Sequence, residues 1–438
     1  MSLLHPLGQV CAIGELDLHA LPVTQQDILK GQTITKTTNN ALTPHTQSFD
    51  FTFEPTSLYT DLGETELYLE YKVEKPDGTA LVVADTAAPV NNIGHSLFKA
   101  CQLLINGEKV TSNNEDYATR AYLLDLLGTS KSDKLSRMAG CQLWKKDTQG
   151  EMDVAGAANT GWVARRLSSS GNSTKSVILR PHLDLLNQCK LLPSHCGLKF
   201  IFERSSSSFY MLQDAAGTHF INITKAEMRV RQVLVRDEVV QAHNEAVMDP
   251  KIGPFNYPIT RTRVTKHTLD GGSLEYSWTQ PDTTQIPTRI VVGLVKETAA
   301  SGIKNENPFH FRNYGVGEVE VKFNDQKFEI ETDFTSGNVQ RAYYQLFKDT
   351  GIMANGLDCD ISLEEFKNGY TLFAFDLTPD RAPEDHHRIN FLRQGRLTIS
   401  LKFKTATPHS IATIVCSFFN NNIKLNADRL PITDYYMA

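Results

Sequence analysis

Residues 66–74 read Glu-Leu-Tyr-Leu-Glu-Tyr-Lys-Val-Glu, a segment in which large apolar side chains occupy every second position. These positions are Leu67, Leu69, Tyr71 and Val73, and charged residues or tyrosine separate them. Successive side chains of a β-strand point to opposite faces of the sheet, so this period of two predicts a strand with one buried and one solvated face. Antiparallel sheets that are covered on one side only produce this pattern.

The same alternation recurs along the rest of the chain. It appears in residues 226–231, 318–323 and 397–404. Between two apolar runs in residues 101–111 stands Asn106-Gly107, the pair most typical of a two-residue type I′ hairpin turn. The sequence therefore predicts several antiparallel strands and at least one tight hairpin.

Helical periodicity is short wherever it occurs. It predicts a helix over residues 116–127, where Gly128 ends the pattern, and another over residues 340–347. Neither helix is long enough to form a domain, so both are expected in connections at the ends of β-sandwiches. Ser, Thr, Asn and Gln together make up about a quarter of the chain, a composition that suits wet strand faces and turns. The expected fold class is all-β.

An internal repeat indicates two similar domains. The chain has 438 residues, and half of it is a comfortable length for one β-sandwich. Three short matches occur in the same order in both halves, at displacements of 218, 221 and 203 residues: Asn106-Gly107 with Asn324-Asp325, Arg120-Ala121-Tyr122 with Arg341-Ala342-Tyr343, and Gly197-Leu198-Lys199-Phe200 with Ser400-Leu401-Lys402-Phe403. This order favours two tandem sandwiches over a single large domain.

The composition along the chain suggests where these domains begin and end. Residues 1–45 are expected to form an N-terminal arm, 46–240 the first sandwich, and 259–438 the second sandwich with a C-terminal tail. Residues 241–258, with three prolines around Gly253, are expected to form the linker. Residues 128–175 are rich in Gly, Ser, Ala and Thr and are expected to form a long loop. That loop and residues 296–307 are expected at an outer or inter-subunit surface.

Charge and hydropathy exclude several classes of protein. The 44 basic and 50 acidic residues give a net charge of −6, so no positive excess exists to grip a nucleic-acid backbone. The longest apolar runs fall well short of the roughly 18 residues that a membrane-spanning helix needs. The N-terminus has neither the basic region nor the apolar core of a signal peptide. Seven scattered cysteines fit a reducing compartment.

No group of residues forms a recognisable catalytic or cofactor motif. The chain lacks a phosphate-binding Gly-rich loop and a Gly-x-Ser-x-Gly elbow. The other candidates considered are His386-His387 beside Glu384 and Asp385, the set Cys189, His195 and Cys196, the calcium-loop-like set Asp358, Asp360 and Ser362, and the tryptophans Trp144, Trp162 and Trp278. The calcium-like set lacks the Gly and Glu that such a loop requires, and the others lack a complete ligand set. We expect no catalytic, cofactor or metal site, and no enzyme.

An ordered series of segments resembles one family of proteins. The segments are residues 91–107, 191–204, 307–311 (Asn-Pro-Phe-His-Phe), 341–343 and 368–379 (Asn-Gly-Tyr-Thr-Leu-Phe-Ala-Phe-Asp-Leu-Thr-Pro). In these segments the chain resembles the major capsid proteins of Polinton (Maverick) elements and adintoviruses. That family belongs to the double jelly-roll lineage of adenovirus hexons and virophage capsids. The likeness spans roughly residues 60–430.

The resemblance implies both a fold and a function. The fold would be two tandem eight-stranded jelly rolls with short helices in the connections. Three copies would form a pseudohexagonal capsomer that tiles an icosahedral shell. Its partners would be neighbouring capsomers, with penton and minor capsid proteins, and its location would be the virion.

Two other functions fit an all-β tandem chain. One is a carbohydrate-binding or carbohydrate-processing pair of β-sandwiches, for which exposed tryptophans or a facing pair of carboxylates would be needed. The other is a minor capsid or penton protein, although a five-fold vertex needs only one barrel per subunit. A stable trimer in solution would favour the major capsid protein over both.

Overall fold

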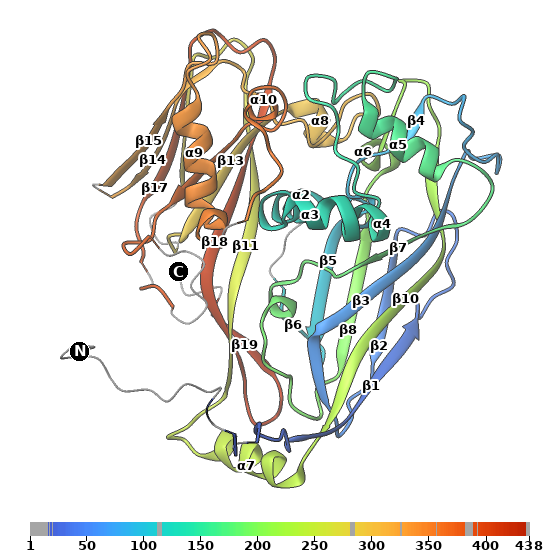
Figure 1. Ribbon diagram of the computed structural model, residues 1–438, viewed down its shortest axis with the longest axis vertical. Coiled ribbons are helices and arrows are strands. Elements are labelled where there is room, and N and C mark those ends of the chain that lie inside the picture. The colour runs from blue at the N-terminus through green and yellow to red at the C-terminus, as the bar shows by residue number, and fades with distance from the viewer. Residues whose placement is uncertain are drawn as a thin grey trace.

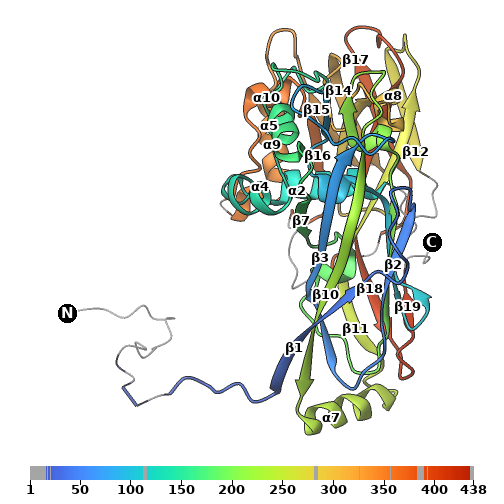
Figure 2. The same ribbon diagram turned by 90° about the vertical axis from the view of Figure 1, so that its right-hand side faces the viewer.

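The computed structural model describes residues 16, 18–19, 21–111, 116–280, 285–324, 326–355, 357–381, 389–391 and 393–434. Two β-sandwiches stand side by side with their long axes roughly parallel (Figure 1). Ahead of the first strand, residues 21–27 run away from both sandwiches (Figure 2).

The first sandwich consists of two antiparallel four-stranded sheets. One sheet has the order β1 (Ile28–Thr37), β10 (Phe220–Val235), β3 (Tyr59–Glu74) and β7 (Lys175–Leu179). The other has the order β2 (Ser48–Phe53), β8 (Leu198–Arg204), β5 (Phe98–Ile105) and β6 (Glu108–Lys109). A separate pair joins β4 (Ala87–Pro89) to β9 (Met211–Gln213).

The second sandwich repeats this arrangement. One sheet has the order β11 (Phe255–Leu269), β18 (Ile411–Leu425), β13 (Arg289–Lys296) and β16 (Leu372–Asp376), with β19 (Pro431–Thr433) added beside β18. The other has the order β12 (Glu275–Gln280), β17 (Leu397–Phe403), β14 (Val316–Phe323) and β15 (Gln326–Glu331). When the eight main strands of each half are numbered in chain order, both halves have sheets 1-8-3-6 and 2-7-4-5. This is the jelly-roll arrangement, and the predicted fold class is confirmed.

The strand that opened the sequence analysis lies at the centre of this fold. Leu67, Leu69, Tyr71 and Val73 are at most 1% exposed, as their alternation predicts, and they face the interior of the first sandwich from β3. On β17 the inward-facing side chains are likewise buried, at most 6% exposed: Leu397, Ile399, Leu401 and Phe403. Most of the buried apolar residues of both sandwiches form one continuous cluster that runs through the contact between them, and Tyr59, Val233 and Val235 form a small second cluster.

The three repeat matches fall on equivalent elements, although one is out of register. Asn106 and Asn324 both have positive φ and start the turns after β5 and β14, while Asp325 lies outside the described residues. The Arg-Ala-Tyr triplets lie on the two helices that link the fifth and sixth strands of each sandwich. In the third match the ladder registers pair Leu198 with Ile105 and Leu397 with Phe323, so Leu198 corresponds to Leu397 and not to Leu401.

The helices are short and lie in the connections between strands. Figure 1 shows α2 between the two sandwiches and α7 joining β10 to β11 at one end of the molecule. They are α1 (Ile93–Ser96), α2 (Tyr117–Gly128), α3 (Lys131–Asp133), the π-helix η2 (Lys134–Met138), α4 (Ala139–Cys141), α5 (Thr160–Ser169), the 3₁₀-helix η3 (Asp184–Asn187), α6 (Ser207–Tyr210), α7 (Asp237–Met248), α8 (Glu297–Ser301), α9 (Gln340–Asp349), the 3₁₀-helix η4 (Ile352–Asn355) and α10 (Leu363–Lys367). Among the described residues, no helix is long and apolar enough to cross a membrane.

Three segments differ from the sequence-based expectation. Residues 128–175 are not a plain loop, because they contain four helical segments and the buried side chains of Trp144 and Trp162. The stretch expected to be a linker, 241–258, contains most of α7 and the start of β11. The stretch expected to be an arm, 1–45, contains β1, which pairs with β10 at the edge of the first sandwich. We therefore propose a first domain that includes β1.

Candidate functional site: the seam between the sandwiches

The two sandwiches meet along a buried contact that we call the seam. It is formed by α2, residues 128–175 and residues 184–197 of the first half, packed against β11, residues 296–312 and residues 358–370 of the second half. Residues 128–175 were expected at an outer or inter-subunit surface because small polar residues dominate them. Part of this stretch packs instead inside the seam, through large side chains such as Trp144 and Trp162.

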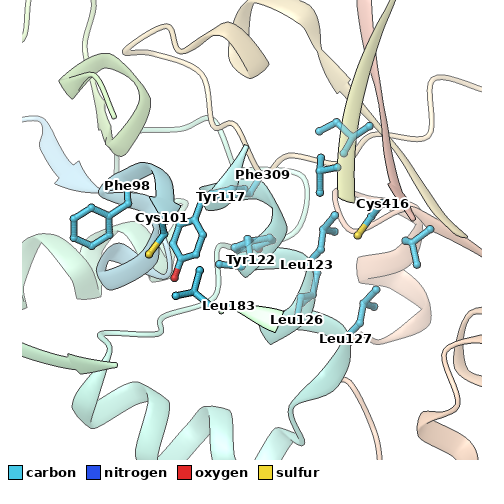
Figure 3. Packing of buried hydrophobic residues seen from close by; sticks show 14 of the residues in the cluster. Phe98, Cys101, Tyr117, Tyr122, Leu123, Leu126, Leu127, Leu183, Phe309 and Cys416 are labelled. Atoms are coloured by element: carbon cyan, nitrogen blue, oxygen red, sulfur yellow. The ribbon is translucent and has the colours of Figure 1, made fainter. Parts of the chain in front are cut away.

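Helix α2 occupies the middle of the seam. Nearly every residue from Tyr117 to Leu127 is buried, so the helix has no solvated face. Figure 3 shows its side chains lying between Phe98 and Cys101 of the first sandwich and Phe309 and Cys416 of the second. The ring of Tyr122 stacks on that of Phe309 with a centroid distance of 4.0 Å and an interplanar angle of 3°. This stacking fixes the helix against the second half.

A buried ion pair extends the contact on the same helix. The Arg120 guanidinium donates to the carboxylate of Asp184 on η3, and both side chains are about 95% buried. The backbone N–H of Thr262, on β11 of the second half, donates to the same carboxylate at 3.2 Å. The Asp184 carboxylate therefore accepts hydrogen bonds from both halves of the chain.

A second buried carboxylate, that of Asp147, organises residues 128–175. Arg165 Nη2 donates to Asp147 Oδ1 at 2.5 Å, and Asn159 Nδ2 donates to the same oxygen at 2.9 Å. From the second half, Asn307 Nδ2 donates to Asp147 Oδ2 at 3.0 Å, and the Tyr370 hydroxyl donates to the backbone carbonyl of Asp147 at 2.9 Å. Arg165 and Asp147 are almost fully buried, so their charges are compensated by each other, by these donors and by the carbonyls of Pro89 and Lys145, which accept from the Arg165 guanidinium.

Asp153 forms a third charged contact across the seam. It accepts from the backbone N–H of Asn307 at 2.8 Å, from His310 Nδ1 at 2.8 Å and from the guanidinium of Arg312. Burial alone would raise the pKa of Asp153, but the hydrogen bonds from His310 and Asn307 and the charges of His310 and Arg312 outweigh it and lower this pKa to about 2. The carboxylate therefore stays charged across the neutral range.

The other stretch that was expected at an outer surface, residues 296–307, also lies in the seam. The backbone N–H of Gln213 donates to the carbonyl of Lys304 at 2.7 Å, and Lys304 Nζ donates to the carbonyl of Gly217 at 2.7 Å. Near the other end of the seam, the Tyr257 hydroxyl donates to the carbonyl of Leu191 at 3.0 Å. Hydrogen bonds along its whole length make the two sandwiches one unit.

The candidate metal and sugar sites that fall on described residues do not assemble. Cys189 is exposed while Cys196 is buried, and burial raises the pKa of the Cys196 thiol to about 12. Asp358 accepts from the backbone N–H of Lys131 at 3.0 Å, and Ser362 caps α10. Trp144 and Trp162 are buried and cannot stack on a sugar, while Trp278 is half-buried. His386-His387, Glu384 and Asp385 lie outside the described residues.

Two other groups in the described part of the chain bring three metal-compatible side chains together. The first is Glu318, Glu320 and Glu329 on β14 and β15, and Lys327 Nζ already lies 2.9 Å from Glu320 and also contacts Glu329. The second is His95, Asp125 and His182 beside α2. The sequence carries no signal for this second group, because its members are 30 and 57 residues apart and share no motif.

Two jelly rolls of identical topology, joined by a buried seam, define the double jelly-roll class of β-proteins. No known protein-family profile matches the chain. The uncharacterized protein F54H12.2 of Caenorhabditis elegans is 27% identical over 391 residues, which cover 86% of this chain and 90% of the nematode protein.

Solved structures share the fold at low sequence identity. A chain of the Sputnik virophage structure aligns with a TM-score of 0.64 and 13% identity, covering 98% of this chain and 93% of that chain. The mavirus major capsid protein aligns with a TM-score of 0.53 and 11% identity, covering 99% and 97% of the two chains. The Faustovirus major capsid protein aligns with a TM-score of 0.54 and 9% identity, covering 93% of each. These likenesses establish that the double jelly roll extends over nearly the whole chain.

Proposed function

We propose that this chain is the major capsid protein of a Polinton-like or adintovirus-like element, and that three copies form a pseudohexagonal capsomer. The observation that carries the proposal is that each sandwich presents one exposed face equivalent to a face already buried in the seam. The structural neighbours include capsid proteins of the same fold. They support a capsid role, and the two exposed faces support assembly into a ring; its three members are what the resemblance implies.

The first exposed face is that of α9. Helices α2 and α9 both connect the fifth and sixth strands of their sandwiches. In the seam, α2 is buried against the second sandwich. In α9 only Ala342, Leu346 and Asp349 are buried, and Arg341, Tyr344 and Lys348 are exposed. The outer side of α9 therefore has no sandwich packed against it within the chain.

The second exposed face is that of β1. It occupies the same place in the first sandwich as β11 in the second. In β11 six residues are buried, among them Arg261 and Thr262 in the seam. Every residue of β1 is exposed except the half-buried Ile34. The strand that would complete a second seam is thus open to a neighbour.

The rotation that superposes the first sandwich on the second also relates these two exposed faces to the two sides of the seam. The rotation that takes the first sandwich to the second takes α2 to α9 and β1 to β11. Applied again, it sets α9 of one copy against β1 of the next, which is a head-to-tail contact. Such contacts close into rings when the rotation divides a full turn. Three chains would contribute six sandwiches, the six-sided outline that the resemblance implies.

The lineage within the double jelly-roll class is part of the same proposal. The C. elegans relative covers nearly the whole chain and is encoded by an animal. The partners would be neighbouring capsomers together with penton and minor capsid proteins, and the location would be the virion.

The mass of the purified full chain in solution tests the proposal. A capsomer is expected at three times the chain mass of 49.0 kDa, with particles of hexagonal outline in negative-stain images. Obligate interfaces of this kind bury about 2,000 Å² or more, so the trimer should persist at micromolar concentration. A stable monomer at high concentration, above all one that binds carbohydrate, would overturn the proposal.

A further inference from the structure

The cluster of His95, Asp125 and His182 has the composition of a metal site. His95 lies on α1, Asp125 on α2, and His182 in the segment that follows β7. One donor atom from each lies within 4.8 Å of the others. Two imidazoles and a carboxylate form a set that suits zinc and related divalent ions.

The His95–Asp125 distance in the cluster matches that between two ligands of one ion, whereas His182 and Asp125 are within hydrogen-bond distance. His182 Nε2 lies 2.9 Å from Asp125 Oδ1, and His95 Nε2 lies 3.8 Å from Asp125 Oδ2. Such ions bond nitrogen and oxygen at about 2.0–2.2 Å, so two atoms bound to one ion stand roughly 3–4 Å apart. The separation of 3.8 Å is too long for a hydrogen bond but suits two ligands of one ion.

Further hydrogen bonds hold the donors in place. The Tyr117 hydroxyl lies 2.9 Å from His95 Nδ1 and accepts from the backbone N–H of His182 at 3.1 Å. Asn92 Nδ2 donates to Asp125 Oδ2 at 2.6 Å. Partners of this kind orient the ligands in metal sites, and a group on the second ring nitrogen of a histidine is typical of them. The side chain of His182 is 20% exposed and provides a route of entry.

We propose that His95 Nε2, His182 Nε2 and the Asp125 carboxylate bind one divalent ion of the zinc class. Water or a small rearrangement of a neighbouring side chain would supply the remaining coordination. The ion would tie α2 to α1 and to the segment after β7, and so would brace the first-half side of the seam. This site is independent of capsomer assembly, because all of its ligands come from one sandwich of one chain.

The test measures metal bound to the full-length protein. The chain is stripped with a chelator, reloaded with Zn²⁺ or Co²⁺, desalted and analysed by elemental mass spectrometry. We expect about one ion per chain, a visible Co²⁺ absorption band typical of nitrogen ligation, and a higher melting temperature with Zn²⁺ than without it. A wild-type chain that retains no metal would overturn the proposal, whatever the variants do.

Variants assign the ion to this cluster. His182→Ala removes the most exposed ligand, and its metal content should fall at least tenfold, with the Co²⁺ band and the Zn²⁺ effect on melting lost. The matched control is His219→Ala, because His219 lies 3.3 Å from a single carboxylate, that of Asp85, and should retain the ion. A second control, His386→Ala with His387→Ala, removes the adjacent pair in the sequence.

Each variant result either supports the assignment of the ion to this cluster or overturns it. Full metal content in His182→Ala, or loss of metal in either control, would overturn the assignment. If His182→Ala does not fold, His182→Asn keeps a polar side chain of smaller reach and is scored in the same way. The mass of the chain in solution is recorded in parallel, so a monomer that binds zinc would contradict the capsomer and leave the metal site standing.

Discussion

Helices α2 and α9 hold the same place in two copies of one fold, yet their surroundings are opposite. Both link the fifth strand to the sixth, and both begin near an Arg-Ala-Tyr triplet. Ala121 and Ala342 are fully buried in both. Around these alanines, α2 is buried on every side, whereas α9 keeps an exposed polar face.

The sequence of each helix follows from what packs on its outer side. After Tyr122, α2 continues with Leu-Leu-Asp-Leu-Leu, and its leucines fill the seam. After Tyr343, α9 continues with Tyr-Gln-Leu-Phe-Lys and places charge where α2 places leucine. A contact within one chain can be built of apolar residues that never meet water. The surfaces that form a contact between separately folded chains are exposed to water before assembly, so they need polar residues.

The largest single loss of stability is expected at the tyrosine of the first triplet. Tyr122→Ala removes a fully buried ring that stacks on Phe309, and should lower the free energy of unfolding by about 4 kcal/mol. Tyr343→Ala removes a half-buried ring whose hydroxyl donates to the carbonyl of Ile361, and should cost roughly 1–2 kcal/mol. Urea unfolding of both variants measures the two values. Equal losses of unfolding free energy would mean that packing in the seam does not make Tyr122 more important to stability than Tyr343.

The two arginines of the triplets give the next effect. Arg120→Ala leaves the buried carboxylate of Asp184 without its cation, and should cost about 3 kcal/mol. Arg341 is exposed, and Arg341→Ala should change the stability of the chain by less than about 0.5 kcal/mol. The double variant Arg120→Ala with Asp184→Ala should recover part of the loss. Chemical denaturation that finds no coupling between these positions would contradict the ion pair.

Local periodicity was enough to predict an all-β chain but neither its jelly-roll topology, which the family resemblance implied, nor the seam. Alternation in residues 66–74 and the turn at Asn106 depend on neighbours in the chain, so the strands, the hairpin and the connection helices α2 and α9 could be expected. Trp162 and Arg165 stand among small polar residues without a clear period. Arg165 is paired with Asp147, and Asp147 also accepts hydrogen bonds from Asn307 and Tyr370, which lie 160 and 223 residues from it in the sequence.

The candidate metal site was beyond prediction for the same reason. His95, Asp125 and His182 belong to three connections that only the completed sandwich brings together. The adjacent His386 and His387 looked more suggestive in the sequence because they were close along the chain. Closeness in sequence is a poor guide to ligand sets in β-sandwiches, where most contacts join distant segments.

A third effect concerns the response of the seam to acid. The pKa of Asp153 is lowered to about 2 in the folded chain from an ordinary value of 3.8, so its contribution to stability is complete above about pH 4 and is lost as the pH falls toward 2. The shift corresponds to about 2 kcal/mol. Asp153→Asn should therefore destabilise the chain at pH 7 more than at pH 3.

Unfolding in urea at the two pH values measures this difference. The control is Glu238→Gln, which alters an exposed side chain on α7 outside the seam. If Asp153→Asn and wild type differ by the same amount at both pH values, the contacts of Asp153 with His310 and Arg312 do not stabilise the charged carboxylate.

The smallest effect on the single chain is expected on the outer face of α9, where it bears most directly on assembly. Tyr344 is 56% exposed, and Tyr344→Ala should change the free energy of unfolding by less than about 0.5 kcal/mol. If α9 packs against β1 of a neighbouring copy as α2 packs against β11, this tyrosine becomes an interface residue, and its removal should weaken the trimer by about 2 kcal/mol. Met248→Ala, at an exposed apolar residue on α7 outside that face, is the matched control and should leave the trimer intact. Light scattering across a dilution series separates the two variants. A Tyr344→Ala trimer as resistant to dilution as wild type would mean that α9 is not the counterpart of α2 in assembly, even if the chain proves to be trimeric.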